Sequence, residues 1–228
     1  MKKELLVFGA NGALGKGVSK ILLQKDFDKI YLFDSKFEDF EISGDNVIKI
    51  EVKDLTKEEN VIVAFSHVKP EKEKFYFLFS TIGGFWGGQT IWEITTEDWN
   101  RIFDLNLKTN FLLAKHFSWL VKASAGGSIC ITAAFTAENP EPLKSIYGAS
   151  KNALIHLIKT LALEGQKINL SANAISPYII DTPANRSWMP DSDHTKWVTP
   201  EEIGELVFSL FNTFKFVSGN VITLKNRF

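Results

Sequence analysis

Short runs of consecutive apolar residues alternate along the chain with longer stretches in which apolar positions recur every three to four residues. The short runs predict buried strands, at Leu5–Phe8, Ile30–Phe33, Val47–Ile50, Phe75–Phe79, Ser128–Thr132 and Leu170–Ile175. The longer stretches predict helices, at Leu14–Leu23, Glu58–His67, Glu97–Val121 and Tyr147–Leu163. This alternation is typical of an α/β protein, with a parallel sheet covered by helices on both faces.

The C-terminal part of the chain continues the same pattern. Thr199 and Pro200 precede two glutamates, which predicts a helix over Pro200–Phe211 with Thr199 as its N-cap. A last strand near Val221–Leu224 gives a sheet of about seven strands. Because no repeat, linker or low-complexity tract divides the chain, we predict a single doubly wound, Rossmann-type domain over residues 1–228.

Composition excludes several classes of function. The net charge is -1, which gives no electrostatic reason to expect nucleic acid or an anionic membrane as a partner. No segment approaches the roughly 20 apolar residues of a membrane span. The single cysteine, Cys130, lies in an apolar run and fits a reducing compartment. The four histidines lack metal-ligand spacing, so we expect a cytoplasmic protein with no metal site and a small-molecule substrate.

The first predicted strand leads directly into the glycine-rich sequence FGANGALGKG, with Gly9, Gly12 and Gly15 at a strand-to-helix turn. Glycine permits a tight turn and lets the backbone approach a pyrophosphate. The helix that follows presents free N–H groups and a positive dipole end to such a group. This context predicts a dinucleotide site.

Two carboxylates follow the next two predicted strands. Asp34 lies 19 residues after Gly15, where it can accept hydrogen bonds from both ribose hydroxyls and repel a 2′-phosphate. It therefore favours NAD(H), although the nearby Lys36 leaves NADP(H) as an alternative. Asp54 fits either a contact to the adenine amino group or the cap of the next helix.

Tyr147 and Lys151 stand four residues apart in YGASK, at the start of a predicted helix, and therefore share one helix face. A free phenol has a pKa of about 10. We expect the neighbouring ammonium to lower the pKa of Tyr147 and make the phenol a better catalyst of proton transfer.

The glycine turn, the strand–helix order, the YGASK sequence and the downstream NAISPYIIDTP together resemble the short-chain dehydrogenase/reductase family over nearly the whole chain. The family's glycine motif is matched in part, with Phe8 in place of threonine and Ala13 in place of the middle glycine. The resemblance implies a nicotinamide-dependent oxidoreductase with Tyr147, Lys151 and Asn106 as catalytic residues, Asn106 supporting a proton relay through water.

The same resemblance implies that the segment after the sixth strand holds the nicotinamide carboxamide, and that the two long helices form the interface of a homodimer or homotetramer. Taken together, the predicted cofactor-binding residues are Gly9, Asn11, Gly12, Ala13, Leu14, Gly15, Asp34, Asp54, Leu55, Gly83, Tyr147, Lys151, Pro177, Ile180 and Thr182.

One departure from the family concerns the substrate. The position 13 residues before Tyr147 normally holds a serine that donates a hydrogen bond to a substrate carbonyl, and here it is Ala134. Three stretches, GANGALGK, GGFWGG and DTPANRSWMP, resemble a subgroup of the family that reduces quinonoid dihydropterins and also carries alanine there. Such a conjugated imine is already primed for hydride, so we expect NADH-dependent reduction of a dihydropterin to a tetrahydropterin.

Aromatic residues supply candidates for the substrate pocket. Phe85 and Trp86 lie between glycine pairs and fit a stacking wall for a flat ring, while Trp188, Met189 and Trp197 fit either a substrate lid or a simple cover for the sheet end. The predicted substrate contacts are Ala134, Phe85, Trp86 and Trp188. Arg186 can meet either an anionic substrate group or a neighbouring carboxylate, and His194 either the substrate or solvent.

Two alternatives remain from the sequence. The first is a general carbonyl or oxoacyl reductase in which Thr132 or Thr136 replaces the missing serine. The second is a catalytically silent nucleotide sensor, which the missing serine suggests and the retention of Tyr147, Lys151 and Asn106 opposes.

Overall fold

The computed structural model describes residues 2–38 and 40–227. In this part of the chain, seven parallel strands form one sheet in the order β3-β2-β1-β4-β5-β6-β7. The strands are β1 (Lys2–Phe8), β2 (Lys29–Asp34), β3 (Val47–Glu51), β4 (Lys74–Ser80), β5 (Gly126–Thr132), β6 (Leu170–Pro177) and β7 (Val221–Leu224). The doubly wound α/β sheet predicted from the sequence is confirmed.

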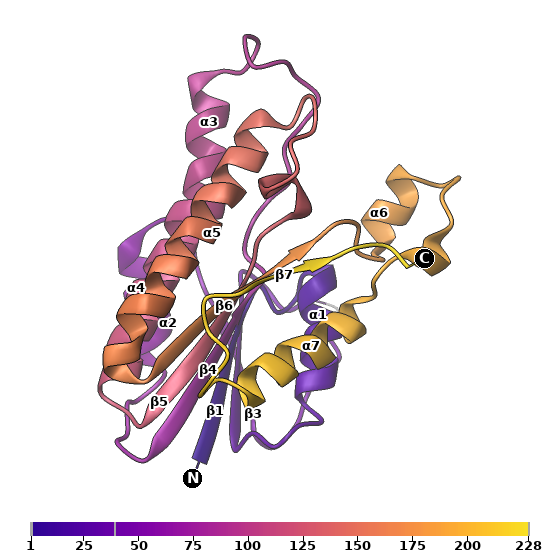
Figure 1. Cartoon of the computed structure of the whole chain (residues 1–228). Coiled ribbons are helices and arrows are strands. Elements are labelled where there is room, and N and C mark those ends of the chain that lie inside the picture. Colours follow the sequence, from indigo (N-terminus) through magenta and orange to yellow (C-terminus); the bar gives the residue numbers. More distant parts are fainter. Residues whose placement is uncertain (1, 39, 228) are drawn as a thin grey trace.

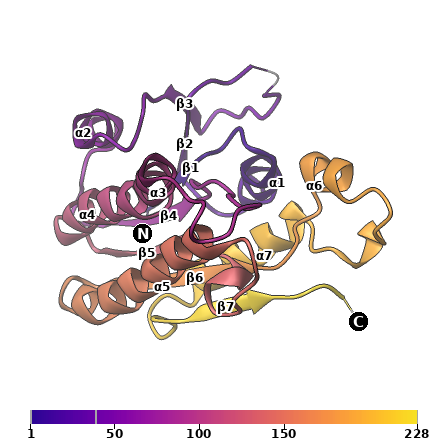
Figure 2. The ribbon, with the colours of Figure 1, turned by 90° about the horizontal axis from the view of Figure 1, so that it is seen from above.

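Helices cover both faces of this sheet, as Figure 2 shows from above. One face carries α1 (Ala13–Leu22) and α7 (Pro200–Asn212), and the other carries α2 (Glu58–Ser66), α4 (Thr109–Lys122) and α5 (Ser145–Gly165). The strands are apolar on both sides because each face packs against its own cluster of buried side chains. Glycine allows α1 and α7 to approach closely, since a Cβ on Gly17 would lie 2.2 Å from the Cβ of Pro200.

The predicted helix over 97–121 is present but is not regular. It consists of α3 (Thr96–Phe103), a π-helical turn at Asp104–Lys108, and α4. The N-cap predicted for the last helix is confirmed: Thr199 accepts a hydrogen bond from the Glu202 N–H, and the Glu202 side chain accepts one from the Thr199 N–H. A further short helix, α6 (Pro183–Trp188), was not predicted. Within the described residues, no helix combines the length and the hydrophobicity that a membrane span requires.

The parallel arrangement brings the carboxyl ends of the strands to one edge of the sheet. Figure 1 shows α6 and the loops that follow β4 and β5 gathered beyond that edge. The strand order reverses between β1 and β4, which are neighbours in the sheet although β2 and β3 come between them in the chain. Doubly wound proteins bind their ligands in the crevice at such a switch point.

Candidate active site

The glycine turn between β1 and α1 has the shape of a phosphate cradle. Gly9 adopts a positive φ of 79°, which favours glycine. A Cβ on Gly15 would lie only 2.0 Å from the Gly9 carbonyl oxygen, so this close approach of helix to turn requires glycine. Gly12 and Ala13 are exposed at the start of α1, where no side chain caps the helix and no acidic residue lies in the first turn. The residues therefore fit a pyrophosphate.

Asp34, at the end of β2, helps to build this turn. Its carboxylate accepts hydrogen bonds from the Asn11 and Ser35 backbone N–H groups, each at 2.7 Å. The Ser35 hydroxyl also donates to this carboxylate, at 3.3 Å. Because a carboxylate has about four acceptor positions, Asp34 keeps one for a ribose hydroxyl. Lys36 is the nearby cation that makes NADP(H) an alternative. Its ammonium forms an ion pair with Glu38 at 2.8 Å, which partly neutralises its charge.

Asp54 and Leu55 follow β3. The Asp54 carboxylate accepts hydrogen bonds from the backbone N–H and the hydroxyl of Thr56, which lower the pKa of Asp54. The alternative that Asp54 caps the next helix is wrong, because α2 begins at Glu58 and its N-cap position is Lys57. Leu55 is buried in the hydrophobic cluster on the α2 face.

The loop after β4 is held by Asn106, which lies in the π-helical turn and is fully buried. The Asn106 side chain accepts a hydrogen bond from the Gly84 N–H at 2.8 Å and donates to the Gly84 carbonyl at 3.1 Å. It also donates to the Ser150 hydroxyl, which in turn donates to the Tyr147 carbonyl. The Asn106 amide is thus engaged in positioning the loop and α5.

Gly83 lies in the same loop, next to two of the predicted catalytic residues, Asn106 and Lys151. A Cβ there would be 2.8 Å from both the Asn106 Oδ1 and the Lys151 Nζ. A larger residue fits only if both of these side chains move. The structure therefore brings Gly83, Asn106 and Lys151 together.

Tyr147 and Lys151 both lie on α5, but their electrostatics differ from the sequence-based expectation. Burial lowers the pKa of Lys151 to about 8. Burial, with a smaller contribution from the charge of Glu141, raises the pKa of Tyr147 to about 12. The expectation that Lys151 lowers the pKa of Tyr147 is wrong for the protein alone, because the lysine Nζ is directed to the Thr132 carbonyl oxygen at 2.8 Å.

Ala134 follows β5 and is almost fully buried. The two hydroxyls proposed to replace the missing serine are both engaged elsewhere: Thr132 donates to the Ser80 carbonyl at 2.9 Å, and Thr136 donates to the Glu141 carboxylate at 2.7 Å. A hydroxyl has one hydrogen to donate. Neither threonine is therefore free to polarise a substrate carbonyl.

Phe85 and Trp86 take different positions. The Phe85 ring is 56% exposed and lies between the Tyr147 ring, at 5.2 Å, and the Trp188 ring, at 5.8 Å, measured between centroids. Phe85 and Trp188 together can form an aromatic wall beside the tyrosine. Trp86 is instead buried with Ile102 and Ile146 behind the loop, so the prediction that it stacks on a substrate is wrong.

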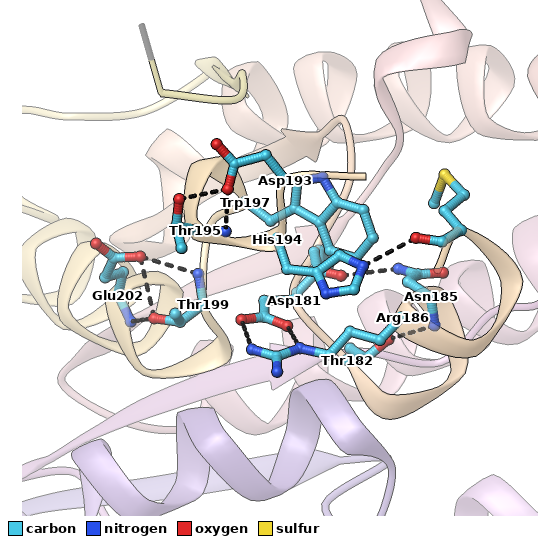
Figure 3. Close-up of polar contacts among 12 residues, drawn as sticks. Asp181, Thr182, Asn185, Arg186, Asp193, His194, Thr195, Trp197, Thr199 and Glu202 are labelled. Atoms are coloured by element: carbon cyan, nitrogen blue, oxygen red, sulfur yellow. Dashed lines mark hydrogen bonds and ion pairs between the residues drawn. The ribbon is translucent and has the colours of Figure 1, made fainter. Parts of the chain in front are cut away.

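The segment after β6 follows the buried Pro177, the last residue of that strand, and leads to α6. Thr182 is the N-cap of α6 and accepts a hydrogen bond from the Asn185 N–H, while the Asn185 side chain donates to the Ile180 carbonyl at 2.8 Å. Figure 3 shows these contacts in one compact segment. The Thr182 hydroxyl remains able to donate a hydrogen bond, as a contact to a carboxamide requires.

The rest of this segment stabilises itself. Arg186 forms a two-point ion pair with Asp181, at 2.5 and 2.7 Å, which lowers the pKa of Asp181 (Figure 3). The neighbouring-carboxylate alternative for Arg186 is therefore the observed one. His194 contacts the Met189 carbonyl at 2.8 Å and packs on Trp197, which is 2% exposed. Trp197 therefore covers the sheet end, whereas Trp188 faces outward.

Sequence reasoning missed the polar residues beneath the site. Asn110 donates to the Ile82 and Asn106 carbonyl oxygens and accepts from the Ser80 hydroxyl. Ser80, Asn110 and Ser150 are all fully buried, and a buried polar group is costly unless it is hydrogen-bonded. Ser80 ends the apolar run FYFLF, and this position is the signal in the sequence that indicates a buried polar contact.

Comparison with known proteins also indicates a short chain dehydrogenase. The sequence model of the short chain dehydrogenase family matches residues 3–193. A dihydropteridine reductase from Dictyostelium discoideum is 29% identical over 210 residues, which cover 91% of this chain and 87% of that protein. Carbonyl reductase family member 4 from Xenopus laevis is 26% identical, covering 98% of this chain and 97% of that protein.

Solved structures share the fold. ElxO with NADP bound superposes with a TM-score of 0.85 at 21% identity, covering 98% of this chain and 97% of that one. A 4-hydroxyisoleucine dehydrogenase complexed with NADH gives a TM-score of 0.83 at 21% identity, covering 100% of this chain and 98% of that one. One of these neighbours holds NADP and the other NADH.

Proposed function

The chain belongs to the short-chain dehydrogenase/reductase family, and we propose that it is a single-domain, cytoplasmic, NADH-dependent reductase of a quinonoid dihydropterin. The observation that carries the proposal is the pairing of a proton-donating tyrosine with an alanine. Tyr147 stands beside an aromatic wall, and Ala134 offers no hydroxyl to a substrate carbonyl. Reduction of a conjugated imine requires a proton donor, but it does not require a hydroxyl that polarises a carbonyl group.

Tyr147 is the proton donor in this proposal. The phenol carries its proton at neutral pH, and its raised pKa, about 12 in the protein alone, makes it a weaker acid than a free phenol. The Phe85 and Trp188 rings extend the apolar surface beside it and favour a flat, conjugated substrate. A bound nicotinamide cofactor would supply the hydride.

Lys151 can serve both binding and proton transfer. Its ammonium is fixed by the Thr132 carbonyl, and two of its three N–H donors remain for a ribose or an ordered water. A pKa near 8 lets it exchange protons close to neutral pH. Asn106 supports this arrangement by holding the loop that contains Gly83 and Gly84.

The preference for NADH rests on Asp34. Its remaining acceptor position suits a ribose hydroxyl, and its negative charge repels a 2′-phosphate at the same place. The ion pair of Lys36 with Glu38 reduces the attraction that Lys36 offers to a phosphate.

The similarity to a dihydropteridine reductase over 91% of the chain supports this substrate class, whereas carbonyl reductase family member 4 favours a ketone. The engaged hydroxyls of Thr132 and Thr136 oppose the ketone. A general carbonyl reductase is therefore only the second candidate.

The deciding experiment compares substrates with the purified protein. NADH oxidation is followed with a freshly generated quinonoid dihydropterin and with a panel of simple ketones, and kcat/KM is measured for each. We expect the dihydropterin to be reduced at least 100-fold more efficiently than any ketone, about the contribution of one oxyanion donor. A ketone turned over as well as the dihydropterin would contradict the proposal.

We also propose that the chain self-associates through α4 and α5. A groove of about 330 Å³ lies where α3, the π-helical turn, α4 and α5 meet, and it is lined by Phe103, Asp104, Leu107, Lys108, Phe111 and Leu157. Phe111 and the nearby Trp99 are about half exposed, which is unusual for large apolar side chains. Light scattering should give the mass of a dimer or tetramer for the wild type and of a monomer for Phe111→Asp.

A further inference from the structure

Glu141 and Lys144 form an ion pair at the mouth of the candidate active site, on the loop between β5 and α5. The Glu141 carboxylate also accepts a hydrogen bond from the buried Thr136 hydroxyl at 2.7 Å. The two side chains are 30% and 23% exposed, so a ligand can reach them although they are mostly covered.

The pair borders the reacting group. Lys144 Nζ lies 5.8 Å from the centroid of the Phe85 ring, and that ring lies 5.2 Å from the Tyr147 ring. Glu141 is near enough to Tyr147 for its charge to add to burial in raising the pKa of the phenol. The ion pair therefore lies next to the aromatic ring that borders Tyr147.

The backbone holds the pair in a defined place. Leu143 has a φ of 63°, a left-handed conformation that is strained for a bulky residue. Its carbonyl oxygen accepts a hydrogen bond from the Gly88 N–H at 3.0 Å and so joins this loop to the Phe85 loop. Backbone strain of this kind is retained where the surrounding structure imposes it, and such positions cluster at functional sites.

Both groups retain binding capacity. A carboxylate has about four acceptor positions, and the Glu141 carboxylate uses two of them, for Thr136 and Lys144. An ammonium has three donors, and Lys144 uses one for Glu141. The loop thus presents an acceptor edge next to a donor.

We propose that Glu141 and Lys144 are specificity-determining residues that bind the polar edge of the substrate ring. An edge with two N–H donors beside a carbonyl, as in a 2-amino-4-oxo heterocycle, matches this order: the carboxylate accepts from the N–H groups and the ammonium donates to the carbonyl. Charge-assisted hydrogen bonds of this kind are the strong ones. The inference rests on the proposed function, because it assumes that a pterin-like ring lies beside Tyr147.

The test compares two unreactive ligands that differ in one group. Pterin carries the 2-amino donor, and lumazine carries a carbonyl oxygen there. Their dissociation constants are measured by fluorescence with saturating NAD⁺, for the wild type, for Glu141→Gln, and for Glu138→Gln as a control with an exposed carboxyl on the same loop. We expect the wild type and Glu138→Gln to prefer pterin by at least about 10-fold, the effect of leaving a polar group unpaired, and Glu141→Gln to bring the ratio close to one.

The outcomes separate this inference from the proposed function. A wild type without preference for pterin, or a preference unchanged in Glu141→Gln, overturns the role of the pair even if quinonoid dihydropterin is reduced. Selective pterin binding that depends on Glu141, in a protein that does not reduce the dihydropterin, supports the pair and overturns the proposed reaction. Lys144→Met is expected to weaken the binding of both ligands, since both carry the 4-oxo group, and an unchanged affinity would overturn the role of Lys144.

Discussion

The Nζ of Lys151 donates a hydrogen bond to the Thr132 carbonyl oxygen at 2.8 Å, so the lysine is tied to the end of β5. In the protein alone the ammonium is therefore not the group that sets the acidity of Tyr147. The phenol keeps a pKa of about 12 through burial and the charge of Glu141. A protonated tyrosine suits the direction of reduction, in which the enzyme gives a proton to the product.

Replacing Lys151 is expected to change both the pH dependence of stability and the activity. Its pKa falls from the ordinary 10.5 to about 8 on folding, so the unfolded chain binds more protons between these values. The free energy of unfolding should therefore rise by about 1.4 kcal/mol per pH unit between pH 8 and 10, apart from other titrations. Lys151→Met should lose that rise together with activity. Parallel urea titrations of wild type and variant across this range would show it, and identical pH dependence would contradict the assigned pKa.

Gly83 is expected to tolerate no side chain. The Cβ of Gly83→Ala would lie 2.8 Å from both Asn106 Oδ1 and Lys151 Nζ, so both must move. A displacement of about 1 Å near the chemistry can cost on the order of 100-fold in rate. We expect kcat to fall by at least 10-fold while the far-ultraviolet circular dichroism stays unchanged. Gly44→Ala, in a loop remote from the site, is the control, and equal effects of the two changes would argue against a special role for Gly83.

Asp34 is expected to act on both the cofactor and the glycine turn. Asp34→Ala removes the charge that repels a 2′-phosphate, and it also removes the acceptor of the Asn11 N–H. The ratio of kcat/KM for NADH to that for NADPH should fall by about 10-fold or more, with weaker binding of NADH itself. A wild-type enzyme that prefers NADPH would show that our interpretation of Asp34 is wrong.

Thr132 and Thr136 are expected to contribute little to the chemical step. Both hydroxyls donate their hydrogen within the protein. In Thr132→Val and Thr136→Val, turnover of the best substrate should change by less than about 10-fold, whereas losing an oxyanion donor costs 100-fold or more. A loss of that size in either variant would restore the carbonyl reductase as the better account.

Much of the fold follows from local sequence patterns. Parallel strands are buried on both faces and so appear as short apolar runs, and Thr199–Pro200 marks a helix start that the structure confirms. The π-helical turn at Asp104–Lys108 was not predicted, because one extra residue in a turn scarcely disturbs the apolar period. The short helix α6 was not predicted, because its six residues contain too few apolar positions to show a period.

Residues of the site were predictable from the sequence where the backbone requires one residue type. They were less predictable where contacts with residues distant in the sequence determine their roles. Gly15 and Gly83 leave no room for a Cβ, and the sequence had singled out both as candidate cofactor-binding residues, a role that stays a prediction. The roles of Phe85 and Trp86 could not be separated, since adjacent residues of a loop carry no signal of which one turns inward. The pKa of Tyr147 depends on burial and on Glu141, neither of which a four-residue spacing reveals.

The central claim is that Tyr147 donates the proton in reduction of a quinonoid dihydropterin. The most direct measurement is the rate of NADH oxidation at pH 7 with freshly generated quinonoid dihydropterin, for wild type and Tyr147→Phe, with NADH affinity determined for both. The account predicts rapid turnover by the wild type, a loss of about 100- to 10,000-fold in the variant, and nearly equal NADH affinity. Equal turnover by both proteins, or none above the uncatalysed rate by either, would contradict it.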